Sequence, residues 1–255
     1  MNMQFRKETV IISGGLGDIG RAIATAFAKQ GANISLGDIQ PATHAREFLA
    51  SLKEYKTRSA YSQVDVTDAD AVQQWVNKTE SDLGIPGIII ANAATVTFAG
   101  IHEISPEQWS RELRVNLDGA FHLTKAATAR LLFHNRPGRV VFMGSWAAHA
   151  VHANIPAYCV SKAGMRMLCK CMALELAPHH ILVNELAAGF VDAGLSGRRF
   201  EKDAAMREEA IQKVPVKKLI TATEVAQQVL LLCHPQNEHM TGSTLLMDGG
   251  LSLLT

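Results

Sequence analysis

The chain has 255 residues, of which 47% are hydrophobic, and its 25 basic and 24 acidic side chains give a net charge of +1. This length and apolar content suffice for one large α/β domain, and the balanced charge offers no electrostatic footprint for nucleic acid. No apolar run is long enough to span a bilayer, and the N-terminal MNMQFRKETV lacks an apolar signal region. We therefore expect a cytoplasmic protein that binds neither nucleic acid nor membrane.

Short apolar runs alternate with amphipathic stretches along the chain. The predicted strands are 10–13, 33–37, 59–64, 87–91, 139–144, 181–186 and 243–247. The predicted helices are 19–30, 41–55, 68–82, 105–134, 156–177 and 222–234. Runs such as GIIIAN and RVVFMG are apolar throughout, as in strands covered on both faces. The alternation predicts an α/β fold with a doubly wound, seven-stranded parallel sheet, helices on both of its faces, and a single domain.

The first strand runs into a glycine-rich loop, SGGLGDIG, which a helix follows. Amides at the start of a helix can cradle a diphosphate, aided by the helix dipole. Asp18 is unusual there, because a carboxylate beside a pyrophosphate repels it. We expect Asp18 to act as a helix N-cap whose carboxylate faces amides, and Gly17 to supply the backbone freedom that Asp18 lacks.

An aspartate, Asp38, ends the second predicted strand, 18 residues after Gly20. A carboxylate at this spacing accepts hydrogen bonds from the ribose hydroxyls of NAD and repels the 2′-phosphate of NADP. No Arg or Lys stands at 17, 37 or 39 to welcome that phosphate. The alternative interpretation is an aspartate that caps a helix before Pro41.

One charged region, Leu195 to Val214, interrupts the rhythm between the sixth strand and the last helix. It is either a solvated helix pair or a mobile substrate lid, at about 190–214, over a site at the carboxyl ends of the strands. Its Arg198 and Arg199 are either solvated or placed to meet an anionic substrate. Four cysteines without C-x-x-C spacing, and no H-x-x-x-H pair, predict reduced thiols, three of them in the core, and no metal site.

Three residues with reactive side chains complete the pattern. Tyr158 and Lys162 are four residues apart on one predicted helix, and Ser145 ends the fifth strand 13 residues before Tyr158. With these marks the chain resembles the short-chain dehydrogenase/reductase superfamily over essentially its whole length. SGGLGDIG resembles the family loop T-G-x-x-x-G-x-G, which makes the literal G-x-G-x-x-G at 15–20 partly coincidental. Further resemblances are Asp65-Val66, Ala91-Asn92-Ala93-Ala94, Asn116 in VNLDGAF, NELAAG at 184–189 and the terminal TGSTLLMDGG.

The resemblance implies a Rossmann-fold domain over 1–255 that binds NAD and a small alcohol or ketone. The catalytic residues that it implies are Asn116, Ser145, Tyr158 and Lys162. The cofactor residues that it implies are Gly14, Leu16, Gly17, Asp18, Ile19, Gly20, Asp38, Ile39, Asp65, Val66, Asn92, Ala93, Ala94, Tyr158, Lys162, Gly189 and Val191. The expected substrate residues are Ser145, Ala147, His152, Asn154, Tyr158, Gly189 and Phe190. Relatives often form homotetramers or homodimers through the two long helices and the C-terminal strand.

The predicted reaction is oxidation of a secondary alcohol, polyol or sugar-like, or reduction of its ketone. A free phenol has a pKa of about 10, so Tyr158 needs Lys162 and the positive nicotinamide to lower it. Tyr158 then acts as general acid or base while Ser145 binds the substrate oxygen. Asn116 is implied to hold a water that connects Lys162 to solvent. Alternatives are an NADP-dependent 3-ketoacyl-type reductase and a non-catalytic NAD-binding regulatory protein.

Several positions depart from the family pattern. Ala188 replaces a proline, Ala193 a threonine, Ala94 a glycine and Ala91 an asparagine. These changes remove hydrogen bonds or flexibility but no reacting group. At roughly 1 kcal/mol per lost hydrogen bond, they predict weak cofactor affinity.

Overall fold

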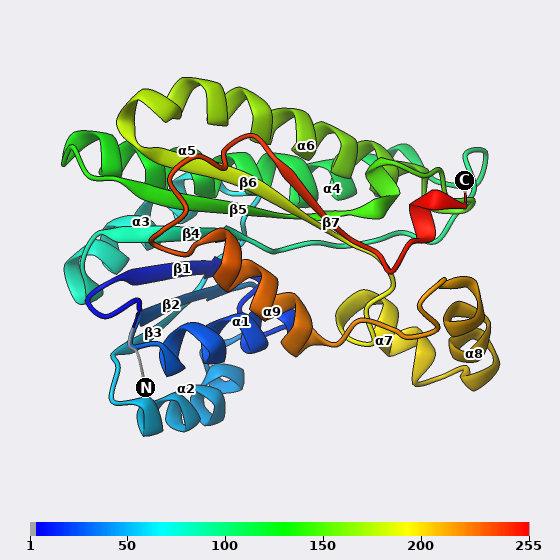
Figure 1. The fold of residues 1–255 in the computed structure, drawn as a ribbon, viewed down its shortest axis with the longest axis horizontal. Coiled ribbons are helices and arrows are strands. Elements are labelled where there is room, and N and C mark those ends of the chain that lie inside the picture. The colour runs from blue at the N-terminus through cyan, green and yellow to red at the C-terminus, as the bar shows by residue number, and fades with distance from the viewer. Residues whose placement is uncertain (1–3, 255) are drawn as a thin grey trace.

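Seven parallel strands form the centre of the computed structural model, which describes residues 4–254 (Figure 1). The strands are β1 (Thr9–Ser13), β2 (Asn33–Asp38), β3 (Ser59–Gln63), β4 (Pro86–Ala91), β5 (Gly138–Ser145), β6 (Ile181–Ala188) and β7 (Thr244–Met247). They lie in the order β3-β2-β1-β4-β5-β6-β7. All seven predicted strands are confirmed, each end within two residues of the prediction.

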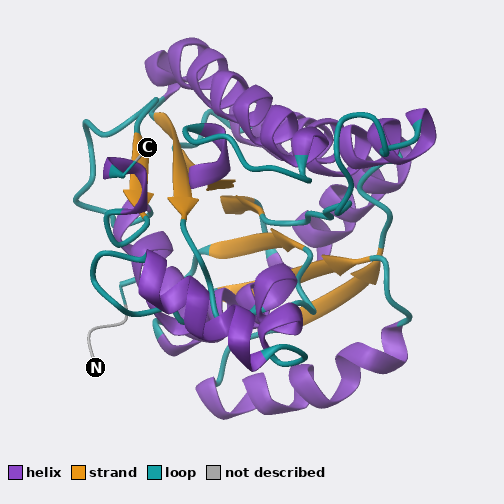
Figure 2. Ribbon diagram, turned by 90° about the vertical axis from the view of Figure 1, so that its right-hand side faces the viewer, coloured by secondary structure: helices purple, strands orange, loops and turns teal. Residues whose placement is uncertain are grey.

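Helices cover both faces of the sheet (Figure 2). One face carries α1 (Asp18–Lys29), α2 (Arg46–Leu52) and α9 (Ala222–Leu232). The other carries α3 (Ala69–Leu83), α5 (Gly119–Phe133) and α6 (Pro156–Leu176). The predicted doubly wound fold is therefore confirmed. Among the described residues, no helix is long and apolar enough to cross a membrane.

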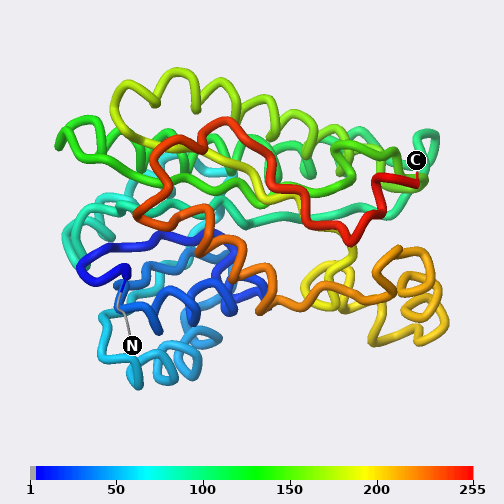
Figure 3. Tube along the Cα trace, in the orientation of Figure 1, coloured from blue at the N-terminus to red at the C-terminus, as the bar shows by residue number. Residues whose placement is uncertain are grey.

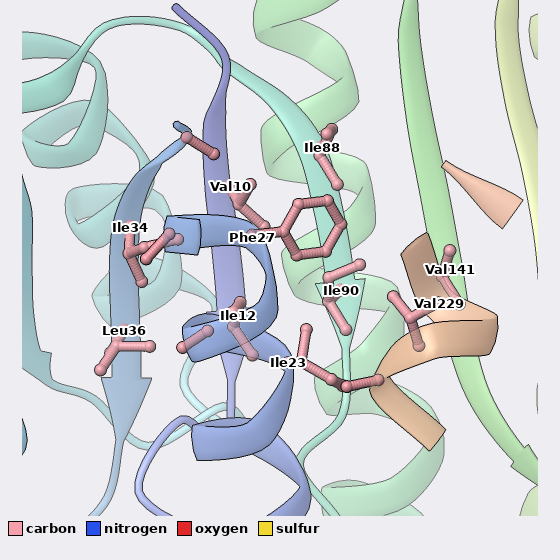
Figure 4. Close-up of a cluster of buried hydrophobic side chains, with 14 of the residues drawn as sticks. Val10, Ile12, Ile23, Phe27, Ile34, Leu36, Ile88, Ile90, Val141 and Val229 are labelled. Atoms are coloured by element: carbon pink, nitrogen blue, oxygen red, sulfur yellow. The ribbon is translucent and has the colours of Figure 1, made fainter. Parts of the chain in front are cut away.

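Two apolar clusters hold these layers together. Alternate residues of a strand point to opposite faces, so Val10 and Ile12 pack toward α1 and α9 while Ile11 packs toward α3 and α5. Figure 4 shows the first cluster, in which Phe27 and Val229 reach the strands from α1 and α9. Because each central strand is buried on both faces, its sequence is apolar without alternation.

The predicted helix at 105–134 is interrupted. It consists of α4 (Pro106–Leu113), a π-helical turn over Arg114–Asp118, and α5. The predicted helix at 41–55 is likewise α2 flanked by 3₁₀ turns, Ala42–Ala45 and Lys53–Tyr55. π-helical turns inside α-helices frequently mark functional sites, and this one contains Asn116.

The charged region after β6 forms α7 (Gly194–Phe200) and α8 (Ala204–Lys213). Figure 3 shows this part of the chain beyond the carboxyl ends of the strands, near the C-terminal segment. There Leu251 packs with Phe200, Ala210 and Val214 in a third, smaller apolar cluster. The α7–α8 segment is therefore attached to the domain by its own core.

The strand order reverses between β1 and β4, which are neighbours in the sheet. In open parallel sheets, ligands bind in the crevice outside the carboxyl ends of the strands at such a reversal. This topology places the glycine loop after β1, the segment after β4 and the serine that ends β5 at one edge.

Candidate active site

A cavity of about 960 Å³ opens at the carboxyl ends of the strands and extends to α7 and α8. The predicted cofactor residues that line it are Gly14, Gly17, Asp18, Ile19, Gly20, Asp38, Ile39, Asp65, Val66, Asn92, Ala93, Ala94, Tyr158, Lys162, Gly189 and Val191. The predicted substrate residues all line it as well: Ser145, Ala147, His152, Asn154, Tyr158, Gly189 and Phe190. The fold thus gathers residues from 14 to 191 around one space.

Two predicted residues do not line the cavity. The side chain of Leu16 is 5% exposed and belongs to the apolar core, so only its backbone takes part in the glycine loop. Asn116 is fully buried behind the cavity wall. Its amide nitrogen donates to the Thr95 carbonyl and the Ser161 hydroxyl, and its oxygen accepts from the Thr95 amide. Asn116 thus links the segment after β4 to α6.

The glycine loop is shaped by close backbone contacts. Gly14 has a φ of +62°, the left-handed conformation that favours glycine. A Cβ at Gly20 would overlap the Gly14 carbonyl, so no larger residue fits there. Gly17, with φ −71° and ψ 161°, has a conformation open to any residue. The freedom predicted for Gly17 is therefore used at Gly14 instead.

Asp38 connects the end of β2 to this loop. Its carboxylate accepts hydrogen bonds from the amides of Leu16 at 3.0 Å and Gln40 at 3.2 Å, and it is 9% exposed at the cavity wall. The following 3₁₀ turn is capped by Pro41 without a side-chain bond, so the alternative of a helix-capping Asp38 is wrong. The carboxylate lies one helix start away from the phosphate-binding amides, as an adenosine ribose requires.

Asp18 has a different partner from the one predicted. Gly17 is the N-cap of α1, Asp18 is the first residue of the helix, and no side chain caps that end. The Asp18 carboxylate instead accepts a hydrogen bond of 2.8 Å from the amide of Gly194, at the start of α7. The expectation of an N-cap is wrong, because the left-handed turn at Gly194, with a φ of +61°, presents an amide across the cavity.

Ser145, Tyr158 and Lys162 converge on the cavity from β5 and α6. Ser145 forms a side-chain hydrogen bond with Tyr158, and its hydroxyl also accepts from the Ala147 amide. The Lys162 ammonium lies 5.5 Å from the centre of the Tyr158 ring. Lys162 is 2% exposed and donates to the carbonyl of Met143 at 2.7 Å. The four-residue spacing on α6 therefore places both side chains against the end of β5.

Burial shifts the proton affinities of this cluster in opposite directions. Loss of hydration raises the pKa of Tyr158 to about 12, and the hydrogen bond with Ser145 works against that rise. Loss of hydration lowers the pKa of Lys162 to about 8, whereas the charges of Glu185 and Glu112 raise it. The protein by itself therefore does not lower the Tyr158 pKa as predicted. A protonated phenol at neutral pH suits donation of a proton to a ketone oxygen.

The far end of the cavity lies between the 145–155 segment and α7. His152 packs its ring edge-on against Trp146, with 4.2 Å between ring centres, and its Nε2 atom is buried without a hydrogen-bond partner. Burial lowers the pKa of His152, so the ring is neutral. The guanidinium of Arg199 lies 4.0 Å from the centre of the Phe98 ring, across the cavity from α7. This contact joins the α7–α8 segment to the wall after β4.

Comparisons with known proteins agree with this geometry. A family model described as enoyl-(acyl carrier protein) reductase matches residues 15–252. The chain is 31% identical to 2,3-dihydro-2,3-dihydroxybenzoate dehydrogenase of Bacillus subtilis over 95% of each chain. The chain belongs to the short-chain dehydrogenase/reductase superfamily.

Two further members of the superfamily show its range. The chain is 30% identical to the 3-oxoacyl-(acyl-carrier-protein) reductase of Thermotoga maritima, with 98% of this chain and 99% of the relative covered. A solved structure of NAD⁺-bound xylitol dehydrogenase is 28% identical and superimposes with a TM-score of 0.91, covering 97% of this chain and all of that one. Within this superfamily the chain is an oxidoreductase, and these relatives differ in substrate.

Some residues around the cavity were not predicted from the sequence. They are mainly the continuation of the segment after β4, at 95–99, and side chains of α4 and α8 such as Arg111 and Met206. The position of 95–99 directly after Asn92-Ala93-Ala94 was a usable signal, because the chain leaves β4 at the same sheet edge. The residues of α4 and α8 carried no such signal. Within residues 4–254 no group of His, Cys, Asp or Glu side chains could hold a metal ion, and of the four cysteines only Cys169 and Cys233 are buried.

We expect replacement of Asp18 to loosen the start of α7. Asp18→Ala removes the hydrogen bond to Gly194, and a loss of ~0.5–1.5 kcal/mol corresponds to roughly twofold to tenfold faster opening. Limited trypsin digestion, which cuts after Arg198 and Arg199, measures this directly. Asp18→Asn keeps an acceptor oxygen and serves as the control. Equal cleavage rates in Asp18→Ala and the wild type would show that this contact does not restrain α7.

Proposed function

We propose that this protein interconverts a secondary alcohol and its ketone with NAD(H), and that Tyr158 is the general acid and base. The observation that carries this proposal is the convergence of Ser145, Tyr158 and Lys162 on the cavity that the glycine loop also lines. A phosphate-binding loop and a proton-transfer group at one cavity are the two parts that hydride transfer requires.

The residues of the cavity fit a dinucleotide. The amides at the start of α1 and the close-packed Gly14 and Gly20 form a cradle for the diphosphate, and Asp38 would bind the adenosine ribose. Asp65 and Val66 would hold the adenine, and Asn92 to Ala94 would line the path toward Tyr158. NAD, when bound, supplies the hydride acceptor or donor.

The remaining steps belong to the protein. In oxidation the Tyr158 oxygen takes the alcohol proton, and in reduction it donates a proton to the ketone oxygen. The Ser145 hydroxyl hydrogen-bonds the substrate oxygen as charge develops there. Lys162, held by the Met143 carbonyl, places a positive charge beside the phenol and favours its ionised form during oxidation. Asn116 fixes α6 relative to the segment after β4.

A polyhydroxylated substrate suits the far end of the cavity. Its wall offers the side chains of His152 and Asn154 beside Ser145. The buried, unpartnered Nε2 of His152 is a hydrogen-bonding atom for which a substrate hydroxyl is a fitting partner. Two relatives named above act on molecules of this kind, a dihydrodihydroxybenzoate and xylitol. The α7–α8 segment, which lines this end, is proposed as the substrate lid.

A second reaction is supported by the relative from Thermotoga maritima, a 3-oxoacyl-(acyl-carrier-protein) reductase. The same three residues perform reduction of a 3-ketoacyl group equally well, so the difference lies in cofactor and substrate. Asp38 favours NADH over NADPH at the ribose and so opposes an NADP-dependent reductase. The third alternative, a non-catalytic NAD-binding regulatory protein, is opposed by the intact Ser145, Tyr158 and Lys162.

Tyr158→Phe is expected to reduce turnover by at least about 10²-fold while NADH binding persists, because the variant keeps the ring but loses the proton. Turnover is measured as NADH formation from a panel of polyols, and binding as NADH fluorescence. Tyr55→Phe, outside the cavity, is the control. Near-normal turnover in Tyr158→Phe contradicts the proposed role. NAD binding without turnover of any alcohol or ketone by the wild type would favour the regulatory alternative.

Asp38→Asn is expected to lower the ratio of NADH to NADPH affinity by about tenfold or more. The variant keeps an oxygen that accepts from the Leu16 amide but removes the charge that repels a 2′-phosphate. Fluorescence titration with each dinucleotide measures the ratio. Asp68→Asn preserves the cap of α3 away from the cavity and is the matched control. An unchanged ratio would remove the argument for NAD.

We propose that the protein assembles as a homodimer or homotetramer through α5 and α6. Val160, Met167 and Leu174 recur every seven residues on α6 and are 48%, 59% and 80% exposed, and Phe133 on α5 is 74% exposed. Apolar side chains that recur at this spacing form one exposed stripe along the helix. The cytoplasmic location expected from the sequence stays a prediction.

Sedimentation velocity is expected to show an oligomer for the wild type and smaller species for the double variant M167E/L174E. Two carboxylates in a buried helix interface lack partners and cost several kcal/mol. Val216→Glu, at a residue 64% exposed after α8, is the control for added surface charge. A monomeric wild type, or an unchanged oligomer in the double variant, rules out this interface.

A further inference from the structure

A buried ion pair lies directly behind Ser145. Arg166 of α6 donates to both carboxylate oxygens of Glu185 on β6, with Nε–Oε2 at 2.7 Å and Nη2–Oε1 at 3.2 Å. The Glu185 side chain is fully buried and that of Arg166 is 14% exposed. A buried ion pair is weak evidence for stability, because the loss of hydration offsets much of the attraction. A charged pair in the otherwise apolar strand ILVNELAA therefore calls for another role.

The remaining donors of the Arg166 guanidinium reach the turn that carries Ser145. Nη2 donates to the carbonyl of Ser145 and Nη1 to the carbonyl of Ala148, each at 3.3 Å. Between these carbonyls lies the 3₁₀ turn Trp146–Ala148, and the Ser145 hydroxyl accepts from the Ala147 amide inside it. One planar group thus holds the backbone on both sides of the turn that orients the serine hydroxyl.

Arg166 also has a fixed relation to the other reactive residues. Tyr158, Lys162 and Arg166 follow one another at four-residue intervals, so the three side chains lie on one side of α6. Ser145 belongs to a different element, β5, and its distance from Tyr158 depends on contacts between that strand and the helix. The contact of Arg166 with the Ser145 carbonyl is such a connection.

Glu185 is itself held in place. The Thr244 hydroxyl on β7 donates to its Oε2 at 2.6 Å. Gly144, the residue before Ser145, packs so closely that a Cβ there would overlap Oε1 of Glu185. The carboxylate is therefore locked between β5, β6 and β7. Its charge also opposes the fall in the pKa of Lys162, so it serves two cations on the same helix.

We propose that Arg166, anchored by Glu185, is a positioning residue that sets the Ser145 hydroxyl against Tyr158 for the hydrogen bond to the substrate oxygen. The proposal rests on the proposed function, because Ser145 and Tyr158 are its reacting groups. It assigns the ion pair to catalysis through the serine and not to cofactor binding.

A double-mutant cycle tests whether Arg166 acts through Ser145. The variant R166M/E185Q removes both charges together, so that no unpaired charge stays buried. Turnover of the best substrate in the polyol panel is expected to fall about 10-fold to 100-fold, as misplacement of a reacting group does, with NADH affinity unchanged. In a Ser145→Ala background, itself slower by about 10²–10³-fold, the same pair of substitutions is expected to change turnover less than about twofold. Equal losses in both backgrounds would overturn the proposal.

A matched control and a milder variant separate positioning from folding. R130M/E80Q removes a second two-point arginine–glutamate pair, between α5 and α3 and away from the cavity, and is expected to leave turnover unchanged. Arg166→Lys keeps the buried charge pair but loses the planar fork, so a folded protein with reduced turnover is expected. Wild-type turnover in Arg166→Lys and in R166M/E185Q would overturn the proposal.

A crystal structure of R166M/E185Q gives an answer that needs no substrate. We expect the Ser145–Tyr158 hydrogen bond to be lost or lengthened while Lys162 keeps its bond to the Met143 carbonyl. An unchanged Ser145–Tyr158 bond contradicts the proposal even if the variant is slow. This result is independent of the proposed function, which fails instead if Tyr158→Phe retains full turnover.

Discussion

Four hydrogen bonds join Ser13 and Gly14 to Asn92 and Ala93 where the strand order reverses, all between 3.0 and 3.1 Å. They tie the glycine loop after β1 to the segment after β4. Because β1 and β4 are neighbours, two pieces of chain about 80 residues apart in sequence form one rigid edge. The position of the phosphate cradle relative to the rest of the cavity depends on this connection.

The same segment carries the constraint onward to the reactive side chains. Asn116 bonds both backbone groups of Thr95 and reaches the Ser161 hydroxyl, which in turn donates to the carbonyl of Tyr158. Glu112, one turn before Asn116, accepts from the Thr97 amide. A continuous set of hydrogen bonds thus runs from the cofactor loop to the helix of Tyr158. Cofactor and proton donor are held in register by backbone contacts, as near-attack geometry requires.

Buried charge is the second organising constraint. Lys162, Glu112 and Glu185 are each at most 2% exposed, and an isolated charge in such surroundings is very costly. The two carboxylates oppose the fall in the pKa of Lys162, and Arg166 neutralises Glu185. The site therefore keeps cations beside the phenol by distributing compensating charge over α4 and β6. Without this compensation, burial alone would favour a neutral lysine and a proton held tightly on the tyrosine.

Asp18 shows how a local departure from a family pattern is absorbed by distant structure. Placed where the family has glycine, it predicted repulsion of the pyrophosphate, yet its carboxylate is engaged by the amide of Gly194. Ala193, beside that amide, stands where the family often has a threonine, so the glycine loop supplies a contact to α7 that the family makes otherwise. The effect of one residue on the cofactor is thus linked to the position of the α7–α8 segment.

The sequence by itself determined the seven strands, their parallel pairing and most of the residues around the cavity. Periodicity and turn chemistry are local, and the motifs Tyr158–Lys162 and Asp38 have fixed spacings that survive any packing. It did not reveal the partner of Asp18, the high pKa of Tyr158, or the use of Glu185 and Arg166 beneath Ser145. These depend on which groups lose water and which amides and carbonyls come within bonding distance. Only the packing of α6, α7 and β6 around the end of β5 decides that, because desolvation and hydrogen bonding act between residues remote in the chain.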